Sequence, residues 1–121
     1  MKMLKWLIMI AKVKQSNIET RRLALAEKQD RDLRLLNFHR KIYDLLKFSD
    51  RADEIQKAAL DRIALWKAKQ LCSEDYINDW KTMLANLDDF ERMALDESDN
   101  GVALRQNSPF SAFMKELMES E

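Results

Sequence analysis

The chain has 121 residues, no formal net charge, 46% apolar residues, and only one glycine and one proline. Its length fits one domain with a core of its own, and its apolar fraction argues against global disorder. Because tight β-turns depend on glycine and proline, their scarcity excludes a fold built from many short strands. The abundant residues are good helix formers, so we predict an all-α bundle of about five to six helices, with a long second helix and a short C-terminal helix.

The charges are unevenly distributed along the chain. Residues 1–70 hold 17 Lys and Arg against 9 Asp and Glu, whereas residues 71–121 hold 4 against 12. Either these two halves attract each other, or each half faces a different partner.

The first predicted helix covers residues 2–15 and is apolar around most of its circumference. Leu4, Leu7, Ile8 and Ala11 have helical spacing, and lysines form a narrow polar strip. Such a helix needs cover from its own chain, another copy or a surface, so we expect a homo-oligomer or hetero-complex contact through residues 2–15. The segment is too short to span a bilayer, and binding to a membrane surface with Trp6 as the anchor is an alternative.

The second predicted helix covers residues 17–48. Ser16 and Glu19 match a capping box, which is a helix-start signal. Residues 27–32 contain no apolar side chain, but they also contain no glycine or proline, so we predict that the helix continues through them. Its C-terminal part carries a heptad-like apolar row of Leu35, Phe38, Ile42 and Leu45.

The remaining predicted elements are helices 51–71 and 74–87, a short helix over 88–95, an acidic loop over 96–101 and a final helix over 110–118. Ser73 and Ser108 are the expected N-caps, and Pro109 suits the first turn of the final helix. We expect Trp66, Tyr76 and Trp80 to form the centre of the core at the turn between helices 51–71 and 74–87. The predicted division is a helical domain over 1–95, followed by an acidic loop plus C-terminal amphipathic helix over 96–121.

The C-terminal segment predicts a protein-binding function. Acidic residues precede an amphipathic helix, and a terminal helix of this kind often docks in a partner's groove. The alternative is that the segment closes the protein's own core. The leading hypothesis is a non-catalytic regulator of the antitoxin, immunity or phage-inhibitor type. Its expected partner-binding residues are Phe110, Phe113, Met114, Leu117, Asp96, Glu97 and Asp99.

Two other binding hypotheses use the N-terminal half of the chain. A small subunit of a larger complex would dock through residues 2–15. A nucleic-acid-binding or assembly protein would contact phosphates through basic side chains of the second helix, although neighbouring acids dilute their charge. The candidate phosphate-binding residues are Arg21, Arg22, Lys28, Arg31, Arg34, Arg40 and Lys41.

Catalytic and metal-binding patterns are weak. No sequence pattern supplies a partner for His39, so we interpret it as a surface or packing residue. Cys72 precedes the Ser73 cap, so we interpret it as a small packed residue at a turn. One histidine and one cysteine cannot form a structural zinc site, and one glycine cannot form a phosphate-binding loop. We therefore expect no enzymatic activity, metal or other cofactor. A lone cysteine also favours a reducing, cytoplasmic setting.

Overall fold

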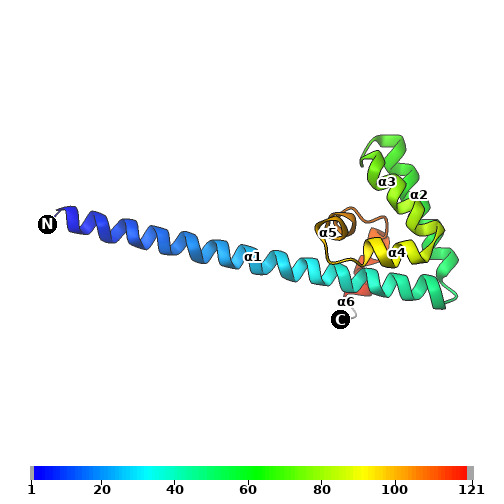
Figure 1. Ribbon diagram of the computed structural model, residues 1–121, viewed down its shortest axis with the longest axis horizontal. Coiled ribbons are helices and arrows are strands. Elements are labelled where there is room, and N and C mark those ends of the chain that lie inside the picture. The colour runs from blue at the N-terminus through cyan, green and yellow to red at the C-terminus, as the bar shows by residue number, and fades with distance from the viewer. Residues whose placement is uncertain (1, 120–121) are drawn as a thin grey trace. The chain divides into compact units, whose positions relative to one another are not determined.

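The computed structural model describes the backbone of residues 2–119 and the side chains of residues 17–118. Over residues 2–119 it contains no strand, which confirms the predicted all-α fold. Figure 1 shows its elements, which are α1 (Lys2–Phe48), α2 (Ala52–Lys69), α3 (Glu74–Ala85), α4 (Leu87–Ala94), α5 (Asp99–Gln106), a 3₁₀ turn (Ser111–Phe113) and α6 (Met114–Glu119).

Helix α1 is continuous, whereas we predicted separate helices over 2–15 and 17–48. The capping box at Ser16 and Glu19 therefore starts no new helix. A serine inside a helix costs only about 0.5 kcal/mol relative to alanine, and neither glycine nor proline interrupts α1. A helix-start signal without a stop signal before it is thus compatible with an uninterrupted helix.

The chain divides between Leu33 and Arg34 into two units, and each is described by itself. The division differs from the predicted boundary at residues 95 and 96. The reason is that Leu104, Phe110 and Phe113 join the same core as residues of α1 to α4. The C-terminal segment is therefore part of the folded unit of residues 34–121.

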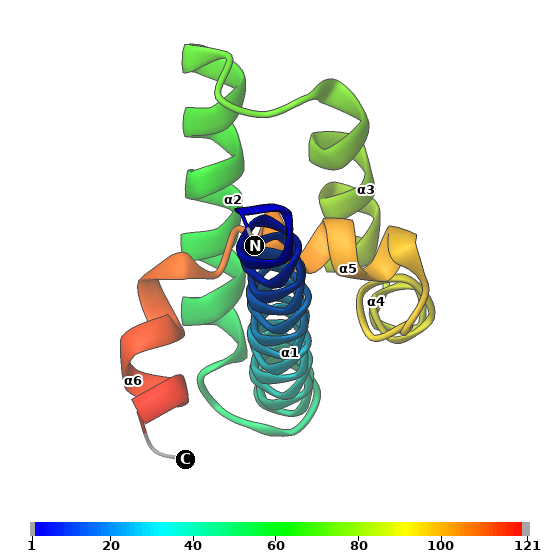
Figure 2. The same ribbon diagram turned by 90° about the vertical axis from the view of Figure 1, so that its left-hand side faces the viewer.

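Within that unit, short polar turns connect the helices. The Ser49 hydroxyl donates to the Leu45 carbonyl oxygen at 2.7 Å and accepts from the Arg51 amide at 3.1 Å, which shapes the turn from α1 to α2. Helix α2 ends at Gln70 in the left-handed conformation, and Ser73 caps α3 as predicted. Figure 2 shows α2 and α3 as two antiparallel helices joined by this second turn.

Trp80 on α3 lies at the centre of the core and is fully buried. Its ring centroid lies 5.5 Å from that of Phe110, 5.9 Å from that of Phe90 and 5.8 Å from that of His39. Trp66 is also buried in this core. However, these ring neighbours of Trp80 come from α1, α4 and the C-terminal segment, rather than from the α2–α3 turn where we expected the centre.

Helix α5 lies partly within the predicted acidic loop of residues 96–101. The Ser98 hydroxyl accepts from the Gly101 amide and caps the helix. A methyl group on Gly101 would collide with the carbonyl oxygen of Asp96. The only glycine of the chain therefore permits a close approach of two backbone segments, whereas we interpreted it as a loop residue.

The C-terminal segment forms a turn, a 3₁₀ turn and then α6, instead of the single helix predicted over 110–118. The Ser108 hydroxyl accepts from the Phe110 amide at 3.2 Å, but the 3₁₀ turn that follows has Phe110 as its N-cap and no side-chain cap, so Ser108 is not the helix N-cap that we predicted. A 3₁₀ turn has about three residues per turn and so aligns side chains three positions apart. This geometry suits Phe110 and Phe113, which are both buried.

Candidate protein-binding surfaces

The apolar residues expected to anchor a partner lie in or against the protein's own core. Phe110 is fully buried and Phe113 is 8% exposed. Met114 and Leu117 are partly buried and pack against the same core. Of the two arrangements that the sequence allows, the structure therefore has the one in which the segment packs on its own fold.

Polar contacts also hold this segment in place. The Lys41 ammonium donates to the Leu117 carbonyl oxygen at 2.9 Å. The Arg51 guanidinium donates two hydrogen bonds to the Glu116 carboxylate, at 2.8 and 3.2 Å. This pairing lowers the pKa of Glu116 and raises the pKa of Arg51. Hydrogen bonds thus connect the segment to both α1 and the start of α2.

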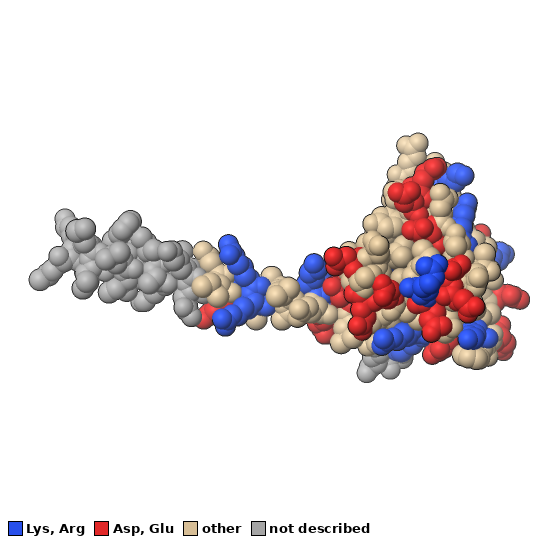
Figure 3. Space-filling view, in the orientation of Figure 1, with Lys and Arg blue, Asp and Glu red and all other residues tan. Residues whose placement is uncertain are grey.

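The acidic candidates Asp96, Glu97 and Asp99 are exposed. Hydrogen bonds from the Ser98 hydroxyl, and from the Ser98 and Glu97 amides, lower the pKa of Asp96. Figure 3 shows Asp and Glu side chains over α4 and its surroundings, with Lys and Arg side chains among them. This face therefore combines both signs of charge, so it presents less negative charge than the residue count suggests.

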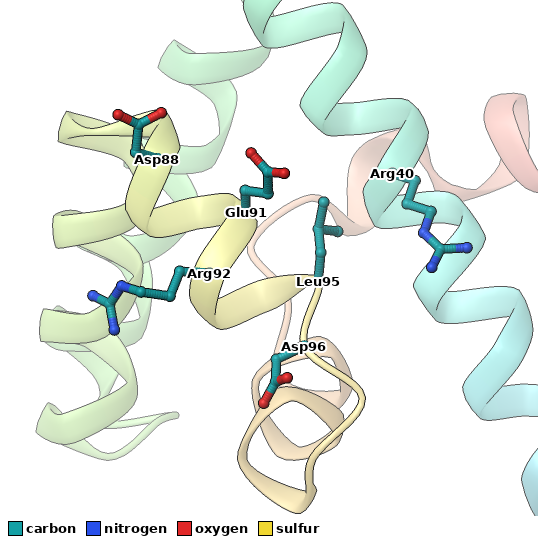
Figure 4. Close-up of a pocket in the computed structure, with 6 residues that line it drawn as sticks. All are labelled: Arg40, Asp88, Glu91, Arg92, Leu95 and Asp96. Carbon is teal, nitrogen blue, oxygen red and sulfur yellow. The ribbon is translucent and has the colours of Figure 1, made fainter.

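A shallow hollow lies beside α4, with a volume of about 560 Å³. Asp88, Glu91 and Arg92 line it from α4, and Arg40 lines it from α1. Figure 4 shows that these side chains point in different directions and do not converge on one point. A specific small-molecule site needs convergent polar groups, and this hollow does not supply them.

His39 is fully buried, and both of its ring nitrogens have hydrogen-bond partners. Nδ1 lies 2.7 Å from the Leu35 carbonyl oxygen, which can only accept, so Nδ1 carries the proton. Nε2 then accepts from the Ser108 hydroxyl at 2.8 Å. Burial lowers the pKa of His39 to about 4. This arrangement gives the neutral imidazole a structural role, because it links α1 to the C-terminal segment.

The candidate phosphate-binding residues do not share one face of α1. Arg21, Arg22, Lys28, Arg31, Arg34 and Arg40 are exposed, while Lys41 is half-buried. At about 100° per residue, Arg22 and Arg31 lie on opposite sides of the helix. Residues 17–33 also contain four basic and four acidic side chains. The arrangement is therefore unlike a single basic stripe.

The surface that the sequence analysis did not single out is the apolar part of α1 between residues 17 and 33. Side chains here are exposed, except for Asp32, which is half-buried. The exposed fraction is 48% for Ile18, 65% for Leu23, 56% for Leu25 and 54% for Leu33. A heptad spacing links Ile18 to Leu25 and was a usable signal. Polar neighbours concealed that signal, and the exposure of these residues required the structure.

No known protein family, curated protein or solved structure matches the chain. Among the described residues, no group of His, Cys, Asp and Glu side chains has an arrangement that could hold a metal ion. No helix in the described part of the chain has both the length and the apolar character needed to cross a membrane. Two exposed surfaces are candidate contacts for a partner: the apolar side chains of α1 between residues 17 and 33, and the acidic side chains of Asp96, Glu97 and Asp99.

Proposed function

We propose that this chain is a non-catalytic protein-binding regulator or complex subunit that engages its partner through α1. The observation that carries the proposal is the exposure of Ile18, Leu23, Leu25 and Leu33 along the described part of α1. Isolated helices are marginal in water, and most helices in proteins depend on tertiary packing of an apolar face. A partner helix or groove would supply that packing to residues 17–33.

The structure of the C-terminal segment favours α1 over the acidic half as the main contact. Phe110 and Phe113 would have to leave the core to bind a partner, and removing a buried phenylalanine side chain costs about 3–5 kcal/mol. Exposed side chains on α1 carry no such penalty. The acidic residues Asp96, Glu97 and Asp99 are exposed and remain a secondary contact in this proposal. An antitoxin, an immunity protein, a phage inhibitor or a complex subunit could all act through such a surface.

The proposal is tested by affinity purification from the native host with matched variants. Ile18→Gln with Leu25→Gln removes apolar surface and keeps helix propensity, because glutamine is a good helix former. We expect this double variant to lose the proteins that the wild-type chain retains. A variant with Asp96, Glu97 and Asp99 changed to Asn should keep them. Retention by the first variant together with loss by the second would assign binding to the acidic half instead.

A nucleic-acid partner is the second candidate, supported by the exposed basic side chains of α1. Phosphate contacts would make the affinity fall steeply as salt rises. A mobility-shift titration of duplex DNA and of RNA against salt measures this. A shift at low salt that disappears in the Arg21→Gln, Lys28→Gln variant would support this second candidate, and no shift at low salt would remove it.

A further inference from the structure

The described part of α1 carries a short apolar row with heptad spacing, formed by Ile18 and Leu25, and this row is called the seam. Basic residues lie along one edge of the seam. Residues seven apart differ by about 20° around a helix, so Ile18 and Leu25 lie almost on one line. These two occupy heptad position d, which the sequence continues upstream at Leu4 and Ala11 and downstream at Asp32, where the apolar row ends. Arg22 and Gln29 occupy position a, and the next a position, Leu36, is buried in the core of residues 34–121.

A basic row runs along one edge of this seam. Arg21 and Lys28 are both exposed and occupy position g, and Lys14 precedes them in the sequence at the same heptad position. In two-stranded coiled coils, position g faces position e of a parallel partner, and these edge pairs determine which helices associate. The opposite edge of this seam carries Glu19, Ala26 and Leu33 at position e.

A second copy of the chain fits this edge poorly. In a parallel self-pair, Arg21 would face Ala26 and Lys28 would face Leu33, so neither basic residue would meet an acid. Two Arg22 side chains would also meet at position a. In an antiparallel self-pair the two basic rows would face each other, and like charges at these positions are destabilising. The charge pattern instead requires acidic residues on the partner.

We infer that residues 15–29 of α1 bind an acidic heptad helix of another protein, which has apolar residues at its d positions and Glu or Asp along the edge facing Arg21 and Lys28. The partner's a positions are polar, because Arg22 and Gln29 lie opposite them. The inference rests on the proposed function and names the chemistry of the partner. Polar residues at a positions reduce stability but fix the register, so the pairing is specific and of modest strength.

The probe is a pair of synthetic heptad peptides that span residues 15–29, with Leu at every d position and Gln at every a position. One peptide has Glu at its e and g positions, and the other has Lys there. We expect the full-length chain to bind the Glu peptide about tenfold or more tightly than the Lys peptide, as measured by fluorescence anisotropy. Added salt should reduce this preference, because the edge charges are exposed.

Matched variants of the chain identify the edge that is responsible. Arg21→Glu with Lys28→Glu should reverse the preference between the two peptides. Ala24→Gln is the control, because Ala24 is exposed on the same helix but lies about 120° away from Ile18 around it. This control should leave both affinities unchanged.

Three outcomes would overturn the inference. These are equal binding of both peptides, absence of binding to either, and dimerisation of the chain alone that Ile18→Gln with Leu25→Gln abolishes in sedimentation. The last result would assign the seam to a second copy. The proposed function would survive the first two results if the host purification still showed retention that depends on Ile18 and Leu25, so failures of the two claims are distinguishable.

Discussion

The buried imidazole of His39 couples the stability of the residue 34–121 unit to pH. Its pKa is about 4 in the folded chain and about 6.5 when exposed. The unfolded chain therefore binds the proton first as the pH falls. Stability should decrease from about pH 6.5 down to about pH 4, by about 3 kcal/mol in total, and should then lose no more through this group.

Urea denaturation at a series of pH values measures this dependence. His39→Phe keeps an aromatic ring in the core and removes this titrating group, so the decrease between pH 6.5 and about pH 5 should disappear, and only the smaller acid-side loss from Glu116 and Asp96 should remain. At neutral pH the variant should also be less stable than the wild-type chain, because the Ser108 hydroxyl loses its acceptor. A wild-type chain whose stability is constant between pH 6.5 and 4 would show that His39 is not buried as a neutral base.

A second prediction at the residue scale concerns the stability of a chain in which Gly101 is replaced. Its α-carbon lies so close to the Asp96 carbonyl oxygen that Gly101→Ala creates a clash inside the α4–α5 connection. We expect a loss of about 1–3 kcal/mol, which is typical of overpacking. Asn100→Ala is the control, because Asn100 is exposed one position earlier on the same helix. Thermal denaturation that shows equal effects of both changes would be inconsistent with this close approach.

At the scale of elements, helix type and number were more predictable than helix boundaries. Composition and the Ser73 cap predicted helices correctly, because those signals are local. Ser16 was misleading for the same reason, since a local cap pattern does not decide whether a helix ends before it. Helix α5 was missed because Gly101 and its acidic neighbours resemble a loop. In the structure, the Ser98 cap and Arg105, which donates to the Ala94 carbonyl oxygen at 2.8 Å, hold this segment as a helix.

Substitutions in the C-terminal segment test whether this segment is a stable part of the core. Phe110 contacts the rings of Trp80, Phe90 and His39, so Phe110→Ala should cost about 3–5 kcal/mol. Met114→Ala is the comparison, and it should cost distinctly less because Met114 is only partly buried. Denaturation of both variants checks the order. A similar small loss for both would mean that the segment is detachable, as the helix-in-groove hypothesis requires.

At the scale of the molecule, the division at Leu33 and Arg34 separates charge as well as structure. Residues 1–33 hold eight Lys and Arg against four Asp and Glu, whereas residues 34–121 hold thirteen against seventeen. The sequence showed the asymmetry but placed its boundary elsewhere. The reason is that contacts between residues far apart in sequence, such as those of Trp80, decide where a folded unit begins.

This division predicts the course of limited proteolysis. Arg21, Arg22, Lys28 and Arg31 are exposed and lie outside the core cluster of the described residues, so trypsin should cut there first. A fragment that begins near Arg34 should persist, because residues 34–121 contain the core. Mass spectrometry over time identifies the fragments. Early cleavage after Lys81 or Arg105, within the unit, would contradict the assigned division.

Photo-crosslinking in the native host tests the proposed binding role of α1 most directly. A photoreactive residue replaces Leu25 on the seam in one variant and Leu65 on α2 in another, and both positions are exposed. We predict that the residue at position 25 crosslinks to a different protein and that the residue at position 65 does not. Crosslinks from position 65 together with none from position 25 would contradict the assignment of partner binding to α1.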